Sequence, residues 1–89
     1  MKAQEIINEV LSGGVKLIRP RKEEHVKGTP YEYDCKEAFT GSKKGWIYVD
    51  SFTASAMKRV FNALSIENQA KYNNIHFQRL VDFTWKSTK

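Results

Sequence analysis

The most informative part of the chain is numbered 31 to 36 and reads Tyr31-Glu32-Tyr33-Asp34-Cys35-Lys36. Aromatic or apolar side chains alternate there with charged ones, which is the period of a β-strand with two unlike faces. A strand with one face on a core and one face in solvent is typical of antiparallel sheets. This stretch therefore predicts a half-exposed antiparallel strand.

Two other strand-like stretches lie on either side of it. Residues 15–19 alternate well enough for a strand that Pro20 closes, and residues 46–49 are strong β-formers. A polar loop, 21–28, follows the first strand. Residues 40–45 carry glycines and read as a hairpin-type turn before the last strand. The pattern predicts that residues 15–49 form a three-stranded meander.

Helical patterns occupy both ends of the chain. The first helix is expected over residues 3–11, with Ser12-Gly13-Gly14 ending it. The last forty residues predict three helices, over 54–64, 66–72 and 75–86. Asp50, Ser51 and Thr53 offer N-caps to the first of these, and Ser65 starts the second.

The order α-β-β-β-α-α-α, with strands grouped before helices, favours an α+β fold. We expect a three-stranded antiparallel sheet packed against the N- and C-terminal helices. Four apolar residues of the last helix form its expected core stripe: Phe77, Leu80, Val81 and Trp85.

Size and composition limit the possible classes of protein. The chain has 89 residues, which suits a single domain spanning 1–89. It has no apolar run long enough to span a bilayer, no apolar run near its start typical of a signal peptide, and one cysteine, Cys35. We therefore expect a cytoplasmic protein without a membrane partner, with Cys35 as a small buried apolar residue.

Catalytic and metal-binding patterns are missing from the sequence. Neither His25 nor His76 has an orienting partner nearby in sequence, so surface or structural roles are expected for both. Glu32 and Asp34 share a strand face, where charged residues are ordinary. No phosphate-loop, dinucleotide, zinc-protease or serine-hydrolase motif is present. The sequence predicts a protein that is not an enzyme and that needs no cofactor or metal.

Charge gives the stronger indication of function. The net charge is +5 and the pI is about 9.4, and the positive excess lies in the early loop and the helical part. Such a chain favours nucleic acid or another anionic partner, such as an acidic protein surface. The predicted phosphate contacts are Arg19, Arg21, Lys22, Lys43, Lys44, Lys58 and Arg59. The predicted stacking or interface residues are Tyr31, Tyr33 and Trp46, with Tyr48 as a further platform.

Two alternatives stay open. The C-terminal helices suggest a helix-turn-helix, although the start of the last helix, Ile75-His76-Phe77, is more apolar than a base-reading helix requires. The many aromatic side chains favour a protein-binding adaptor or inhibitor instead. Small size without catalytic motifs is typical of accessory proteins from phages and other mobile elements.

Overall fold

The computed structural model describes residues 1–21, 25–39 and 41–87. Within these residues the elements follow the predicted α+β order, with a short 3-10 turn added before the last helix. They are α1 (Ala3–Gly13), β1 (Lys16–Pro20), β2 (Tyr33–Glu37), β3 (Ile47–Val49), α2 (Ser51–Ala63), α3 (Ile66–Lys71), η1 (Tyr72–Asn74) and α4 (Phe77–Ser87). The fold class is confirmed.

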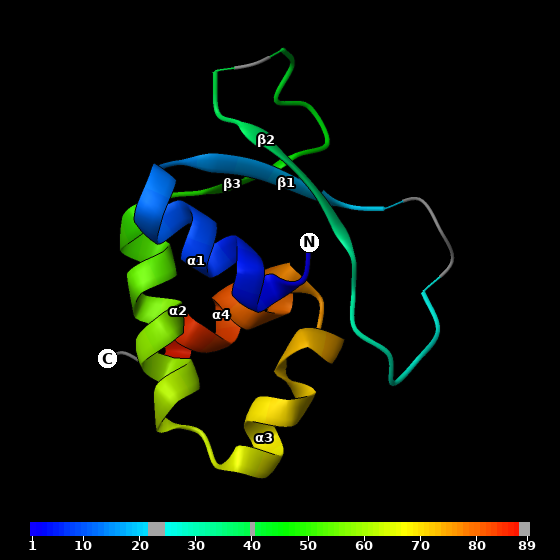
Figure 1. Cartoon of the computed structure of the whole chain (residues 1–89), viewed down its shortest axis with the longest axis vertical. Helices are drawn as coiled ribbons and strands as arrows, with labels where there is room; N and C mark the ends of the chain where they lie inside the picture. Colours follow the sequence, from blue (N-terminus) through cyan, green and yellow to red (C-terminus); the bar gives the residue numbers. More distant parts are fainter. Residues whose placement is uncertain (22–24, 40, 88–89) are drawn as a thin grey trace.

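The order of the strands differs from the prediction. The sheet has the order β2-β1-β3, with β1 antiparallel to both neighbours (Figure 1). A meander would place β2 in the centre, so that prediction is wrong. The hairpin turn expected at 40–45 is wrong as well, because β2 and β3 lie on opposite sides of β1, and the sequence between them is the segment 38–46. We call this segment the crossover; Thr40, within it, lies outside the described residues.

The composition of β1 explains its central place. Leu17 and Ile18 are neighbours in sequence, so they point to opposite faces of the sheet, and both are fully buried. A strand that is apolar on both faces suits the middle of a sheet. The strand β2 carries charged side chains on one face and therefore suits an edge.

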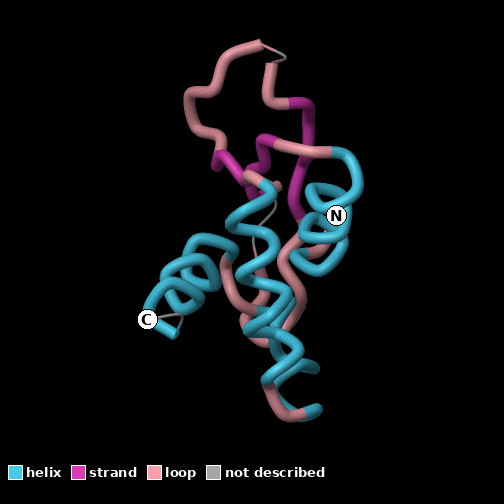
Figure 2. Tube along the Cα trace, turned by 90° about the vertical axis from the view of Figure 1, so that its left-hand side faces the viewer, coloured by secondary structure: helices cyan, strands magenta, loops and turns pink. Residues whose placement is uncertain are grey.

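The helices pack on one face of the sheet. The sheet lies at one end of the molecule, and α2 lies between α1 and α4 (Figures 1 and 2). Ile18, Tyr33 and Val49 point from the sheet into a core that α1, α2 and α4 complete. The start of α4 also reaches β2 directly, because the Phe77 N–H donates to the Tyr33 hydroxyl at 2.7 Å. The first and last helices thus meet the same face, as expected.

Side-chain caps fix where two of the helices begin. The Asp50 carboxylate accepts a hydrogen bond from the Thr53 N–H at 2.7 Å, and the Ser65 hydroxyl accepts one from the Asn68 N–H at 3.2 Å. Both satisfy backbone donors that a helix leaves free at its start. The cap predictions at Asp50 and Ser65 are confirmed. Of the helices in the described residues, none has the length and apolar composition that crossing a bilayer requires.

The inner stripe of α4 is shifted from the predicted one. Trp85 is 39% exposed and stacks on Phe52 of α2, with ring centroids 5.6 Å apart. Thr84 takes the buried position instead, and its hydroxyl donates to the Leu80 carbonyl at 2.8 Å. That bond satisfies the hydroxyl inside the core, so a small polar residue is tolerated there. The prediction of Trp85 as a core residue is therefore wrong.

Candidate nucleic-acid interface

The face of the sheet that turns away from the helices carries the candidate site. The register pairs Leu17 with Lys36 on one side and with Tyr48 on the other. Since side chains alternate along a strand, Arg19 lies on this same outer face. We define the outer-face patch as Arg19, Lys36, Lys43, Lys44, Trp46 and Tyr48.

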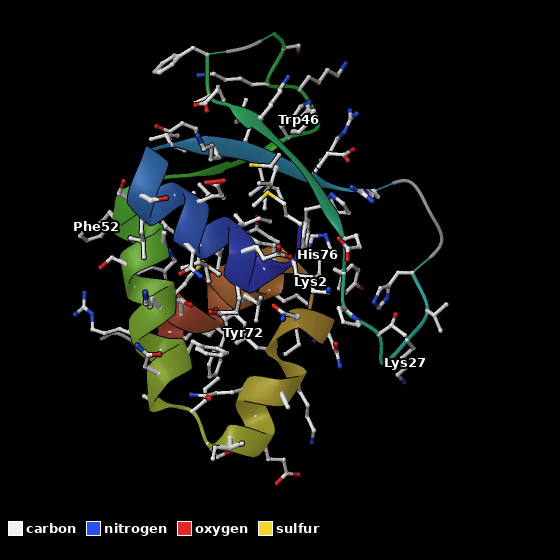
Figure 3. The ribbon with its side chains drawn as sticks, viewed as in Figure 1. Lys2, Lys27, Trp46, Phe52, Tyr72 and His76 are labelled. Atoms are coloured by element: carbon white, nitrogen blue, oxygen red, sulfur yellow. The ribbon has the colours of Figure 1, made fainter. Side chains whose placement is uncertain are left out.

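Trp46 is the centre of a cation–aromatic cluster in this patch. The Arg19 guanidinium carbon and the Lys36 ammonium nitrogen each lie 4.3 Å from the centroid of the Trp46 ring. Both distances are within the range in which a ring attracts a cation. The indole therefore holds two positive charges from neighbouring strands side by side. Figure 3 places Trp46 at the sheet, far from Phe52 on the side of α2.

The crossover adds positive charge beside the sheet. Lys43 and Lys44 are exposed in it, and the Lys43 ammonium lies 5.9 Å from the centroid of the Tyr48 ring. One hydrogen bond holds this segment to the sheet, and a second one closes a turn within it. The Lys36 ammonium donates to the Ser42 carbonyl at 2.9 Å, and the Trp46 N–H donates to the Lys43 carbonyl at 3.1 Å. The crossover lysines are thus positioned next to the aromatic residues of the patch.

One carboxylate balances part of this charge. Asp34 lies on the outer face of β2, where its oxygens are 3.6 Å from Arg19 Nε and 3.3 Å from Arg21 Nε. Because the carboxylate is shared between two arginines, it cannot neutralise both. Among the described residues, neither of the two exposed crossover lysines has an acidic side chain within ion-pair distance. The patch therefore keeps a positive excess.

The structure brings some of the predicted site residues together and separates others. The outer face holds Arg19, Lys43, Lys44 and Trp46. Arg21 lies at the edge of this face, where its Nε is 3.3 Å from the Asp34 carboxylate. Lys58 and Arg59 are exposed on α2, outside the patch. Lys22 lies outside the described residues.

One predicted role needs correction, and one further cation of β1 is not available to a partner. Tyr33 was expected to stack or form an interface, but it is 1% exposed, and burial raises its pKa to about 12. Lys16, on the same early strand as Arg19, is buried on the inner side and paired with Glu37. Both residues occupy inward positions of their strands, so neither is available to a partner. Tyr31 is half-buried and already stacked on His25.

Lys36 is the residue of the outer-face patch that was not predicted from the sequence. The signal for it was present, because it follows Glu32 and Asp34 on the charged side of the alternating stretch. What was missing is where the segment before β3 runs. The pairing of β1 with β2 places Lys36 near Arg19, and the crossover brings the Trp46 ring to both cations.

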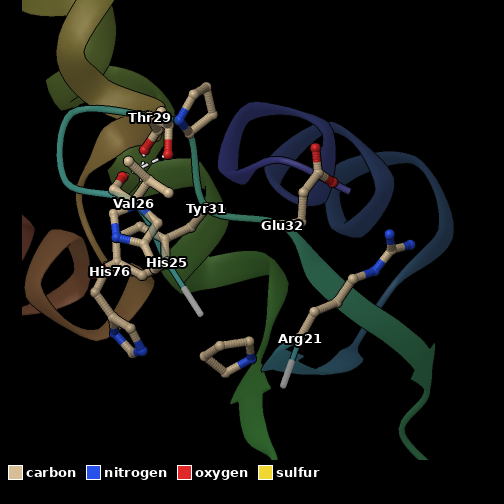
Figure 4. A pocket seen from close by; sticks show the side chains of 9 residues that line it. Arg21, His25, Val26, Thr29, Tyr31, Glu32 and His76 are labelled. Carbon is tan, nitrogen blue, oxygen red and sulfur yellow. Dashed lines mark hydrogen bonds between the residues drawn. The ribbon is translucent and has the colours of Figure 1, made fainter. Parts of the chain in front are cut away.

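The sequence shows no partner near either histidine, but in the structure the two histidines contact the same tyrosine. His25 stacks on Tyr31 with ring centroids 3.5 Å apart, and His76 meets Tyr31 edge-on at 5.4 Å. They line a pocket of about 400 Å³ together with Arg21 and Glu32 (Figure 4). His76 also caps the start of α4, because its Nδ1 accepts a hydrogen bond from the Gln78 N–H at 3.2 Å.

The stability of the fold is expected to depend on the charge of His76. Burial, and then the nearby His25, lowers the pKa of His76, and a protonated Nδ1 can no longer accept from Gln78. The pKa of His76 in the unfolded chain is about 6.5. The unfolding free energy should therefore be at its highest above about pH 6.5 and should fall as the pH drops below that value. Urea unfolding between about pH 7.5 and about pH 5 measures this loss.

A matched variant isolates this histidine from other titrating groups. Asparagine at position 76 does not titrate and keeps an oxygen that can accept from Gln78. The H76N variant should therefore lose less stability than the wild type over the same pH range. Identical slopes for the two proteins would show that other groups cause the pH dependence. The groups around His76 are His25 and Tyr31 from the loop, Tyr33 from β2, and Arg79 from α4.

Other reactive side chains are engaged in the structure. Burial raises the pKa of the Cys35 thiol, which disfavours a reactive thiolate. Glu32 accepts from the Met1 amine at 3.2 Å, and Asp34 is held by arginines. Within residues 1–21, 25–39 and 41–87, no group of three or more His, Cys, Asp or Glu side chains is placed to hold a metal ion.

The helical half carries a second surface feature. Two hollows of about 440 and 450 Å³ share Leu64 and Phe83 and run between α2, α3 and α4. Their walls are largely apolar. Three cations also line them: Arg59, Lys71 and Arg79.

The start of α4 does not have the form of a base-reading helix. Phe77, its first residue, is buried, and its N–H is bonded to the Tyr33 hydroxyl. A helix that reads the major groove needs its N-terminal residues free to reach base edges. The packing of α4 therefore weighs against the helix-turn-helix alternative.

Comparison of the chain with protein-family models, curated proteins and solved structures gives no match. What the patch binds is therefore inferred from its own chemistry.

Proposed function

We propose that this protein is a non-catalytic module that binds nucleic acid through the outer-face patch. The observation that carries the proposal is the cluster on the sheet, where Arg19 and Lys36 both lie 4.3 Å from the Trp46 ring and two exposed lysines follow in the crossover. Guanidinium and ammonium groups contact phosphates, and aromatic rings beside them can contact bases.

An NMR titration of the labelled protein with single- and double-stranded oligonucleotides tests this proposal. Amide shifts are expected on the outer face and in the crossover, and they should shrink as salt rises. If the four cations of the patch each contact one phosphate, the logarithm of the affinity for a single strand should fall with the logarithm of salt at a slope of about −3. An absence of shifts at low salt would reject the proposal.

A second candidate function is the binding of a protein segment. It is favoured by the groove that the two hollows between α2, α3 and α4 form together. Its apolar walls and its cations, Arg59, Lys71 and Arg79, complement an amphipathic helix with acidic residues beside its apolar stripe. Titration with such a peptide tests this candidate. The F83A variant should bind this peptide more weakly and should bind oligonucleotides as the wild type does, and this result would support the candidate. No binding of the acidic peptide would exclude it.

A further inference from the structure

The aromatic residues of the patch differ in how accessible their rings are. Tyr48 is 55% exposed and lies on the outer face of the edge strand β3, opposite Leu17 of the central strand. Trp46 is only partly exposed, and its ring already meets Arg19 and Lys36. Tyr48 is therefore the more accessible of the two rings, while Trp46 positions the cations.

The surroundings of Tyr48 suit a nucleotide with an unpaired base. A base stacked on the Tyr48 ring would have its phosphate within reach of Lys43, whose ammonium lies 5.9 Å from the ring centroid. In a duplex the faces of the bases are covered by their neighbours in the stack, so an exposed tyrosine on a sheet gains little there. Base–aromatic stacking is worth about 1–3 kcal/mol per base and tolerates any sequence.

The elements that would read a duplex are poorly placed in this fold. The start of α4 is buried against β2, so this helix cannot present its first residues to a major groove. Lys58 and Arg59 lie on α2, away from the aromatic rings of the patch. The cations that lie beside the aromatic rings of the patch are those of the sheet and the crossover.

We propose that the ligand of the outer-face patch is a single strand, with an unpaired base stacked on Tyr48 and the adjacent phosphates held by Lys43 and the Arg19–Trp46–Lys36 cluster. This inference rests on the proposed function. It adds the form of nucleic acid that is bound and the residue that selects it.

The test compares a single strand of about 12 nucleotides with the duplex that it forms with its complement, by fluorescence anisotropy at about 50 and about 200 mM salt. The single strand should bind more tightly at both salt concentrations. The Y48A variant should lose about 5- to 150-fold in affinity for the single strand, which is the range that one stacked base implies. The Y48F variant should keep the affinity, because the ring is what stacks.

A matched control uses another exposed aromatic residue. Phe52 is 74% exposed on α2, outside the patch, so F52A should bind the single strand as the wild type does. Duplex binding equal to or tighter than single-strand binding, with Y48A behaving as wild type, would overturn the inference and leave the proposed function standing. No binding of either form would reject both. The titration is run with DNA and RNA strands of the same sequence, and a preference for either single strand over its own duplex supports the inference.

Discussion

Reversing two charges in the crossover, in the K43E/K44E variant, is expected to reduce the affinity for a single-stranded oligonucleotide by about 25-fold or more at about 0.1 M salt. For a single strand, each lost phosphate contact reduces the slope of log affinity against log salt by about 0.7. Two contacts therefore account for about a 25-fold change in affinity between about 0.1 and about 1 M salt. The new carboxylates add repulsion to this loss. Anisotropy titrations of wild type and variant over a salt series measure both the affinity and the slope.

The control for this variant changes charge by the same amount elsewhere. In the K58E/R59E variant two exposed cations of α2 are reversed, so the net charge of the protein falls equally. If binding depended only on net charge, the two variants would be weakened alike. A loss that is clearly larger for K43E/K44E locates the contact at the patch. Equal losses would show that the patch is not the binding surface.

The second large effect is expected on stability. The Y33A variant should lose about 3–5 kcal/mol of unfolding free energy, which is the usual cost of removing a large buried aromatic side chain. The Tyr33 ring lies 5.9 Å from that of Phe77, in the layer between the sheet and α4. A domain of this length has a total stability of only about 4–13 kcal/mol. Urea unfolding followed by circular dichroism measures the loss.

A milder variant separates the hydroxyl from the ring at the same position. Y33F keeps the ring but leaves the buried Phe77 N–H without its acceptor, which should cost about 1–3 kcal/mol. The matched control is Y48F on the outer face, where loss of an exposed hydroxyl should change stability by less than about 0.5 kcal/mol. If Y33F is as stable as the wild type, the contact between Tyr33 and α4 does not hold the helix in place.

The predictions that came true rest on local chemistry. A residue such as Asp50 caps a helix through groups only three residues away, so its role can be read from the sequence. Gly14 follows the same logic, since its φ of +90° at the end of α1 is a conformation that glycine adopts at little cost. The alternation in residues 31–36 correctly separated Tyr33 and Cys35 from Asp34 and Lys36 as the two faces of β2.

Only part of the candidate site could be predicted, because local chemistry does not show which distant segments come together. Arg19, Lys43, Lys44 and Trp46 were identified from charge and residue type, but these features apply equally to Lys58 and Arg59. The sequence also assigned similar roles to tyrosines that the fold separates, because Tyr33 and Tyr48 lie on opposite faces of the sheet. Which of two faces meets the helices is settled by the packing of distant segments.

By itself the sequence determined the elements of this protein, their order and the positions of its caps, because these depend on residues within one or two turns or on the period of one strand. The tertiary structure alone decided that β1 lies between β2 and β3, and that the Trp46 ring meets both Arg19 and Lys36. It also decided that His25 and His76 meet at Tyr31. The physical reason is that strand pairing and burial are set by the whole core, in which the strand that is apolar on both faces takes the central place.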